Sequence, residues 1–380
     1  MINIHDKRSC CGCWACMQRC PQQCISMEPD EQGFLYPKVD HSNCINCGVC
    51  EKVCPVLHPN KEQKPLKLLA GRNQDIEVVM QSSSGGLFSA LATETLSNKG
   101  VVFSAIYNKN WQVEHARADS NHQLPSMRGS KYAQSNIGKA YKEAEIDLKH
   151  GKKVLFVGTP CQIAGLKHFL HKDYEQLLTI EVFCHGVPSP LVWGKWLEYI
   201  SKGKGINDIC QRDKRTGWTS YSVRYRLENK EICHYAWSDD YMRGFIYDYM
   251  LRPACYLCPS KGGRSGADIA LGDLWGINKT NILNDEKGIT LAVINSEKGL
   301  TAIKKYCQYE LNVASISDYN NGYRNSVEQS QLSTFFWKKF LDEGIKALRQ
   351  TNDHHGPSRL ILRWLLLKIK LSKPIGGIKL

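Results

Sequence analysis

Two cysteine runs with the same spacing lie in the first part of this sequence and restrict its fold more than any other feature. The first run reads C-x2-C-x2-C-x3-C-P and starts at Cys10, and the second repeats it from Cys44. The repeat distance of 34 residues marks an internal duplication. Residues 25–40, between the runs, alternate in polarity around a glycine, which predicts a short β-hairpin. The chain therefore begins with a small cysteine-rich module.

This spacing is typical of bacterial proteins that bind two 4Fe-4S clusters, in which three cysteines of a run bind one cubane and the fourth binds the other. The predicted ligands of the first cluster are Cys10, Cys13, Cys16 and Cys54, and those of the second are Cys44, Cys47, Cys50 and Cys20. Cys11 and Cys24 are left without a ligand role. Zinc or disulfides are the alternatives, which the pattern disfavours because zinc sites normally use paired C-x2-C knuckles separated by a longer loop.

Composition narrows the class of protein and its environment. Of the 380 residues, 42% are hydrophobic and 23% are charged, which is the balance of a soluble globular protein. Seventeen cysteines without a signal peptide favour metal binding in a reducing compartment, so we expect a cytoplasmic protein. No run of about 18 apolar residues is present, and we expect no membrane-spanning helix. The net charge of +13 does not by itself identify a partner.

Four parts are expected along the chain. They are a two-cluster ferredoxin-type module over 1–57, a linker over 58–67, a larger α/β domain over 68–350 and a basic amphipathic tail over 351–380. In the large domain we predict strands over 101–107, 153–159, 178–184, 267–272 and 290–295, with a hairpin over 220–237. We predict helices over 86–98, 137–149, 162–171, 190–201, 297–307 and 330–349.

A second group of cysteines lies in the large domain. Cys161 comes just after one predicted strand, and Cys184 ends the next. Because the carboxyl ends of both strands of a right-handed βαβ unit lie at the same edge of a sheet, these two residues could converge. Cys255 and Cys258 would complete a four-thiolate site for a third 4Fe-4S cluster. From spacing alone, zinc and unused buried thiols stay open as alternatives.

A serine- and glycine-rich turn at 81–86 opens directly into a predicted helix. Its glycines allow close backbone approach, and its hydroxyls and the helix N-terminus suit a phosphate or pyrophosphate. Segment 127–135 adds Arg128, Lys131 and Tyr132, which suit a cofactor phosphate or ring. The alternatives are a serine-capped loop for the first segment and a solvated surface loop for the second.

The apolar, basic segment 359–371 is too short and too charged to span a bilayer. Two interpretations stay open: a terminal helix packed on the core, or a helix that contacts the inner face of a membrane or a partner. Nucleic-acid binding is not expected, because the basic residues form no recognition motif.

The order of these segments resembles the family of coenzyme F-420 hydrogenase and dehydrogenase beta subunits, which includes plant 7-hydroxymethyl chlorophyll a reductase. The resemblance runs from Cys10 to about Trp275. Besides the cysteine runs and the Cys255/Cys258 pair, it depends on SSGG at 83–86, GSKYAQS at 129–135, GTPCQ at 158–162, CHGVPSP at 184–190, RDKRTGW at 212–218 and GDLWG at 272–276.

The resemblance implies an iron–sulfur flavoprotein oxidoreductase with FAD near a third 4Fe-4S cluster. The implied cluster ligands are Cys161, Cys184, Cys255 and Cys258. The implied flavin-binding residues are Ser83, Ser84, Gly85, Gly86, Lys131, Tyr132, Thr159 and Gln162. Electrons from a ferredoxin or another redox protein would pass through the clusters to FAD and on to a small organic acceptor, a deazaflavin or another compound.

Two further roles stay open at this point. His185, beside Cys184, is the candidate proton donor, and a structural histidine is the alternative. Lys214 and Arg215 are candidates for binding an anionic acceptor. The competing function is a non-catalytic electron-transfer subunit of a larger redox complex, which would have no small-molecule acceptor of its own.

Overall fold

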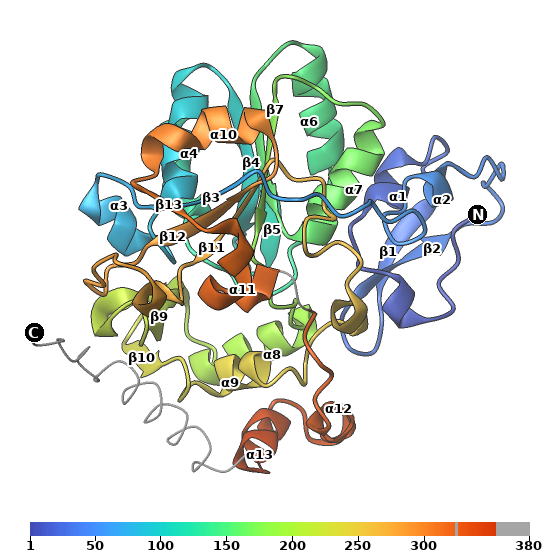
Figure 1. The fold of residues 1–380 in the computed structure, drawn as a ribbon. Coiled ribbons are helices and arrows are strands. Elements are labelled where there is room, and N and C mark those ends of the chain that lie inside the picture. The colour runs from blue at the N-terminus through green and yellow to red at the C-terminus, as the bar shows by residue number, and fades with distance from the viewer. Residues whose placement is uncertain (324–325, 355–380) are drawn as a thin grey trace, which may run out of the picture.

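The computed structural model describes residues 1–323 and 326–354, and Figure 1 shows how its parts are arranged. A small N-terminal module lies beside a larger body that holds an eight-stranded sheet and a three-stranded sheet. The predicted class, an α/β protein with a small ferredoxin-like module before a larger α/β domain, is confirmed.

The N-terminal module consists of a hairpin and two short helices. Strands β1 (Ile25–Pro29) and β2 (Leu35–Val39) pair antiparallel, as predicted. The carboxylate of Asp30 accepts hydrogen bonds from the backbone N–H groups of Gln32 and Phe34 and so fixes the turn. Helices α1 (Ala15–Arg19) and α2 (Val49–Lys52) lie within the two cysteine runs.

The large sheet has the order β13-β3-β12-β11-β7-β6-β4-β5. Its strands are β3 (Lys67–Gly71), β4 (Val101–Tyr107), β5 (Val113–Ala118), β6 (Val154–Gly158), β7 (Leu177–Val182), β11 (Ile269–Asp273), β12 (Thr290–Ile294) and β13 (Tyr309–Leu311). Neighbours among β4, β6, β7 and β11 pair parallel, and the other pairs are antiparallel. The carboxyl ends of the parallel strands therefore lie at one edge, where open α/β sheets bind ligands.

Helices cover both faces of this sheet (Figure 1). The helices around it are α3 (Ile76–Gln81), α4 (Leu87–Ser97), α5 (Leu124–Met127), α6 (Ala140–Lys149), α7 (Pro160–Leu170), α10 (Glu297–Ile303) and α11 (Ile316–Tyr319). Successive side chains of a strand point to opposite faces, so Val101 and Phe103 pack with α6 and α7, whereas Val102 packs with α4. The sheet is thus buried on both sides by separate apolar cores.

The second sheet is built on the hairpin predicted over 220–237. It has the order β10-β9-β8, with strands β8 (Ile206–Asp213), β9 (Ser222–Leu227) and β10 (Glu231–Tyr235). It shares a core with α8 (Pro190–Ser201), α9 (Asp240–Ile246), α12 (Leu332–Glu343) and α13 (Lys346–His354). Short 3-10 helices connect the elements: η1 (Lys7–Ser9), η2 (Asn121–Gln123), η3 (Lys214–Thr216), η4 (Pro253–Leu257), η5 (Ile277–Lys279), η6 (Lys304–Tyr306), η7 (Val313–Ser315) and η8 (Asn321–Tyr323).

Most predicted elements form with small shifts at their ends, and three differ for local reasons. The single helix predicted over 330–349 is wrong, because α12 ends at Glu343 and is capped by Gly344, whose φ is +64°, before α13 begins at Lys346. Helix α6 begins at 140 rather than 137, after Gly138 with a φ of +55°. The helix predicted over 297–307 ends at Ile303 and continues as η6. Strands β3, β5, β8 and β13 have no predicted counterpart.

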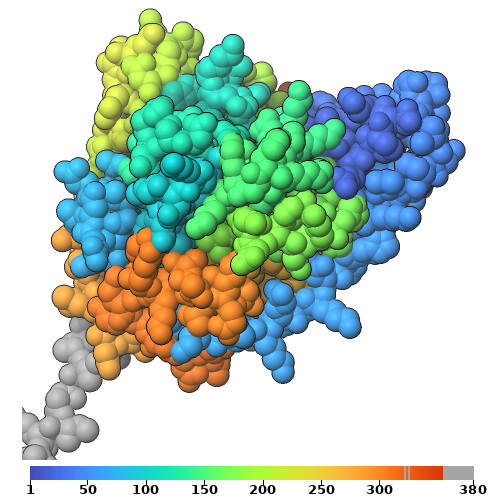
Figure 2. Space-filling view, turned by 90° about the horizontal axis from the view of Figure 1, so that it is seen from above, coloured from blue at the N-terminus to red at the C-terminus, as the bar shows by residue number. Residues whose placement is uncertain are grey.

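The module packs on α6 and α7 through a shared apolar core, and Figure 2 shows the two parts in contact. Trp14 and Ala15 belong to the same buried cluster as Tyr141 and Leu166. The segment predicted as a linker lies against the body, because the backbone N–H of Gln63 donates to the carbonyl of residue 263. No helix within residues 1–323 and 326–354 is long and apolar enough to cross a membrane, and the predicted basic helix lies outside the described residues.

Candidate functional site

The four cysteines assigned to the first cluster lie together around α1. Burial raises the pKa of Cys16, and the negative charges of Cys10 and Cys54 raise it further. A hydrogen bond with Cys11 lowers the pKa of Cys13, but burial and the charges of Cys16 and Cys54 raise it, and the net change is upward. The fold therefore brings the last cysteine of the second run to the first run.

The cysteines assigned to the second cluster line one small pocket. This pocket is lined by Cys20, Cys44, Cys47 and Cys50 together with the unassigned Cys24. The Sγ atoms of Cys20 and Cys24 are 3.4 Å apart. The hydrogen bond with Cys20, followed by burial, raises the pKa of Cys24 to about 12. Cys24 therefore lies beside Cys20, the predicted fourth ligand of this set.

The four cysteines of the large domain converge at the carboxyl edge of the sheet. Cys161 lies in the first turn of α7 directly after β6, Cys184 follows β7, Cys255 lies in η4 and Cys258 follows it. Burial raises the pKa of Cys184, Lys261 lowers it, and the other three cysteines raise it. Three separate segments are therefore folded into one group of thiols.

These sets have the chemistry that a cubane needs. Among residues 1–323 and 326–354, no three His, Cys, Asp or Glu side chains are arranged to hold a single metal ion. The thiolates of a cubane instead each bind a different iron, so a group of four partly separated cysteines, most of them buried or half-buried, fits a cluster. Backbone N–H groups also reach the sulfurs, since Val187 donates to Cys255 Sγ at 3.4 Å and Ile2 to Cys50 Sγ at 3.3 Å.

Cys11 connects the first set with the set in the large domain. Cys11 is 6% exposed, and Cys13 raises the pKa of its thiol whereas Cys161 lowers it, with a net upward change. Helix α7 approaches this loop closely, because a Cβ atom added to Gly165 would lie 3.0 Å from Cys13 Sγ. The two sets are therefore neighbours across a buried interface.

The serine- and glycine-rich turn is fixed to the edge of the large sheet. The hydroxyl of Ser84 donates to the carbonyl of Ile289 at 2.8 Å, and the N–H of Gly85 donates to Thr290 Oγ1 at 2.8 Å. A Cβ atom at position 85 would lie 2.5 Å from the carbonyl oxygen of Gly71, so only glycine fits there. This N–H and this hydroxyl are therefore used within the protein.

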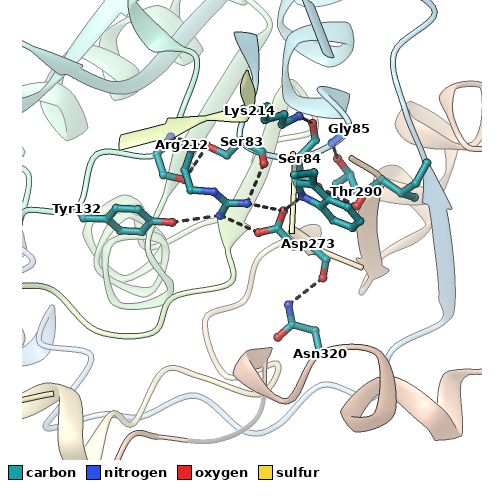
Figure 3. Close-up of polar contacts among 12 residues, drawn as sticks. Ser83, Ser84, Gly85, Tyr132, Arg212, Lys214, Asp273, Thr290 and Asn320 are labelled. Carbon is teal, nitrogen blue, oxygen red and sulfur yellow. Dashed lines mark hydrogen bonds and ion pairs between the residues drawn. The ribbon is translucent and has the colours of Figure 1, made fainter. Parts of the chain in front are cut away.

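A buried arginine connects this turn with the rest of the site (Figure 3). Arg212 pairs with both carboxylate oxygens of Asp273, at 3.0 and 3.1 Å, and donates to the carbonyl of Ser83 at 3.0 Å. It also reaches the hydroxyl of Tyr132 at 3.2 Å. The indole N–H of Trp218 donates to Asp273 at 2.7 Å. One ion pair therefore joins β8, β11 and two loops.

The predicted segment 129–135 lies directly beside the turn. The backbone N–H of Ser130 donates to Ser83 Oγ at 2.7 Å. Lys131 donates to the carbonyls of Arg128 and Gly129, and burial lowers its pKa to about 8. The structure thus brings together the two segments that the sequence singled out for a cofactor.

Gly86 and Arg128 supply a place for an anion at the start of α4. Gly86 caps this 11-residue helix with a φ of +79° and offers no side-chain acceptor to its first N–H groups. The guanidinium of Arg128 lies at the first turn, where Nε donates to Ser89 Oγ at 3.2 Å. A helix N-terminus beside a cation suits a phosphate group.

Thr159 and Gln162 form a reciprocal cap at the start of α7. The Gln162 side chain accepts from the backbone N–H of Thr159 at 2.9 Å and donates to Ser135 Oγ at 2.8 Å. The hydroxyl of Thr159 lies 3.2 Å from Cys161 Sγ. These two residues orient the cysteine, and the side chain of Gln162 is occupied by protein partners.

His185 forms a hydrogen-bonded pair with Asp248 through Nε2 and packs edge-on against Phe245. Its side chain is 41% exposed, so it can exchange protons with solvent. Its role as proton donor stays a prediction.

Lys214 and Arg215 are held by protein groups. Lys214 is buried and donates to the carbonyls of Val79, Ser84 and Lys287 at 2.6–2.8 Å. Arg215 pairs with the carboxylates of Asp213 and Glu231. Neither side chain is free to bind an anionic acceptor in this conformation.

Three residues were missed as site candidates: the buried Arg212 and Arg252 and the half-buried Asp273. Asp273 stands inside GDLWG after an apolar run, and that single acidic residue was the available signal. Arg212 stands inside the charged segment RDKRTGW, where no such signal marks it. Their partners are far apart in the sequence, so spacing could not pair them.

Comparisons with known proteins agree with the two-part organisation. Residues 9–57 match the family described as 4Fe-4S dicluster domain. Residues 151–318 match the family described as the C terminus of the beta subunit of coenzyme F420 hydrogenase/dehydrogenase. The predicted 4Fe-4S module and the family resemblance are confirmed by these matches.

Two curated proteins are similar to parts of this chain. The F subunit of the F(420)H(2) dehydrogenase of Methanosarcina mazei is 25% identical over 250 residues, which are 60% of this chain and 69% of the relative. The coenzyme F420-dependent sulfite reductase of Methanocaldococcus jannaschii is 27% identical over 191 residues, 50% of this chain and 29% of the relative. Among solved structures, a chain of the F420-reducing [NiFe] hydrogenase complex from Methanosarcina barkeri aligns over 76% of this chain and 92% of its own, with 17% identity and a TM-score of 0.44.

Proposed function

The chain joins a 4Fe-4S dicluster domain to a domain of the family of coenzyme F420 hydrogenase/dehydrogenase beta subunits, and we propose that it is an electron-transfer subunit of a larger redox assembly. The observation that carries this proposal is the close approach of α7, the helix of Cys161, to the first cysteine loop, because a Cβ atom added to Gly165 would lie 3.0 Å from Cys13 Sγ. When bound, 4Fe-4S clusters accept and release single electrons. A short distance between two such clusters in the protein interior favours the transfer of electrons from one cluster to the other rather than to molecules in solution.

The protein's own residues hold and shield these sites. Thiolates of the first and second sets would each bind an iron, and Cys161, Cys184, Cys255 and Cys258 would hold a third cluster. Lys261, which is 3% exposed, places a positive charge beside the last set. The exposed Cys47 gives the second set an outward side, where a ferredoxin or another redox protein could exchange electrons.

A flavin-dependent reductase is the second candidate function. The arrangement of Gly86 and Arg128 at the start of α4, which suits an anion, favours this function. The turn before α4 is bonded to the start of β12, at the edge of the sheet that also holds the carboxyl ends of β6 and β7. FAD would be held by the turn at 83–86 with Lys131 and Tyr132, and it would supply two-electron chemistry toward a small organic acceptor. The acceptor could be a deazaflavin, since two relatives carry coenzyme F420 in their names.

Other expectations are retained as proposals. We infer a cytoplasmic location, no nucleic-acid partner, and the part limits 1–57, 58–67, 68–350 and 351–380. Contact of the basic tail with the inner face of a membrane is a separate proposal, because the tail lies outside the described residues.

The test is anaerobic purification followed by measurement of iron, acid-labile sulfide and flavin per chain. About twelve irons would support three cubanes, whereas about eight would remove the third. One FAD per chain, with reduction of coenzyme F420 by the dithionite-reduced chain alone, would favour the reductase. Three clusters without flavin and without such turnover would favour the electron-transfer role.

A further inference from the structure

Arg252 is buried at the boundary between the N-terminal module and the large body. The residue is only 1% exposed to solvent. Nε donates to the carbonyl of Cys10 at 2.7 Å, and Nη2 donates to the carbonyl of Leu35 at 3.0 Å. The guanidinium also stacks on the ring of Tyr36, with 4.3 Å to its centroid. One side chain of the body thus contacts both the first cysteine loop and β2.

The same arginine is built into the segment that carries Cys255. Its backbone N–H donates to the carbonyl of Val187 at 2.9 Å, and its carbonyl accepts from the N–H of Cys255 at 2.9 Å. Its Nη2 lies 3.7 Å from Cys10 Sγ. Arg252 therefore bridges a predicted ligand of the first cluster and a predicted ligand of the third.

Gln134 and Gly12 complete this connection. Gln134 accepts from Arg252 Nη1 at 2.9 Å and donates to the carbonyl of Cys11 at 3.0 Å. Gly12 has a φ of +66°, and a Cβ atom there would lie 2.8 Å from Arg252 Nη1. The cysteine loop can approach the guanidinium this closely because position 12 is glycine.

The charge of Arg252 has cysteines rather than carboxylates as counter-charges. Within the described residues, no Asp or Glu forms an ion pair with it, although a buried charge normally needs compensation. Burial lowers the pKa of Arg252, but the charges of Cys10, Tyr36, Cys11 and Cys255 raise it, and the net change is upward. Its side-chain hydrogen bonds go to the first cysteine loop, to β2 and to Gln134, and within residues 1–323 and 326–354 none goes to a cysteine of the second set.

We propose that Arg252 is a positioning residue that holds the first cysteine set against the Cys161–Cys258 set and raises the reduction potentials of the clusters on both sides. This inference rests on the proposed function, because it requires clusters at both sets. A cluster becomes more negative when it gains an electron, so a nearby buried cation stabilises its reduced form. Electrons that enter at the second set, beside the exposed Cys47, are then transferred through the first set to the set in the large domain.

The test compares Arg252→Gln and Arg252→Lys with the wild-type protein by EPR-monitored redox titration. For Arg252→Gln we expect the reduction potentials of the first cluster and of the cluster in the large domain to fall by at least about 59 mV, which is a tenfold change in the equilibrium constant of a one-electron couple. The potential of the second cluster should stay unchanged. Arg252→Lys keeps the charge and should restore most of this shift. The matched control is Arg243→Gln, which removes a half-buried guanidinium that contacts the carbonyl of Asn352 and the carboxylate of Asp240 rather than cysteines.

Three unchanged potentials in an Arg252→Gln protein with full iron would overturn the inference while leaving the proposed function intact. About eight irons in the wild-type protein would instead refute the third cluster, and the inference with it. If Arg252→Gln loses iron, Gln134→Leu provides the second variant, because it removes one anchor and keeps the charge. It should weaken the magnetic coupling between the two reduced clusters, and unchanged coupling would refute the positioning role.

Discussion

Replacing Asp273 with alanine should be strongly destabilising, because it leaves a buried guanidinium without its counter-charge. The side chains of Arg212 and Asp273 are only 4% and 14% exposed. Removing one partner of a buried ion pair costs about 3–5 kcal/mol, and the indole N–H of Trp218 also loses its acceptor. At about 2 °C per kcal/mol for a large domain, the thermal midpoint should fall by roughly 6–10 °C.

The assay is thermal unfolding at one fixed scan rate. The matched control is Asp318→Ala, which breaks an exposed pair with Lys279, in which the side chains are 58% and 52% exposed, and should cost less than about 1 kcal/mol. The double change Arg212→Leu with Asp273→Leu removes both charges and should cost less than the sum of the single changes. A midpoint for Asp273→Ala equal to that of the control, or strict additivity in the double variant, would refute this reasoning.

Three further outcomes are expected. If Cys20 is the fourth ligand of the second set, the Cys20→Ser protein should lose about four irons, whereas the Cys24→Ser protein should keep them. Iron analysis of both variants distinguishes the two cysteines, and the reverse result would assign Cys24 as the ligand. Gly85→Ala should lower the thermal midpoint and any flavin content, because its Cβ would meet Gly71 O at 2.5 Å; an unaltered protein would refute the close packing of the turn. Burial lowers the pKa of His115 to about 4, below its ordinary 6.5. Between these two pH values the unfolded chain binds more protons than the folded protein, so the free energy of unfolding falls as the pH falls, by at most about 1.4 kcal/mol per pH unit. His115→Gln should flatten the pH dependence of the thermal midpoint in that window, and an unchanged slope would contradict this.

Local pattern was sufficient to predict the cysteine module and most central strands. The two runs carry their ligand spacing within single loops, so the first and second sets could be assigned before any fold was known. Strands β4, β6 and β12 are continuous apolar runs because both faces of the sheet are covered. Each of these strands could therefore be predicted from its own few residues.

Edge elements were harder to predict, since their signal is weak. β13 has only three residues and is exposed at two of them, so it shows no apolar run. β8 is a strand of mixed polarity in which Gln211 and Arg212 are buried by partners from other segments. Tertiary contacts override local propensity at such positions.

The number of thiols, their grouping along the chain and the α/β class of the fold could all be predicted from the sequence. The packing of separate segments was needed to show that Arg252 lies between two cysteine sets, that Arg212 pairs with Asp273, and that Cys24 lies beside Cys20. Each of these contacts joins residues whose relation depends on how separate segments pack, and spacing along a chain carries no information on that. The charged residues that lie between the cysteine sets and beside the serine- and glycine-rich turn can therefore be identified only from the packed structure.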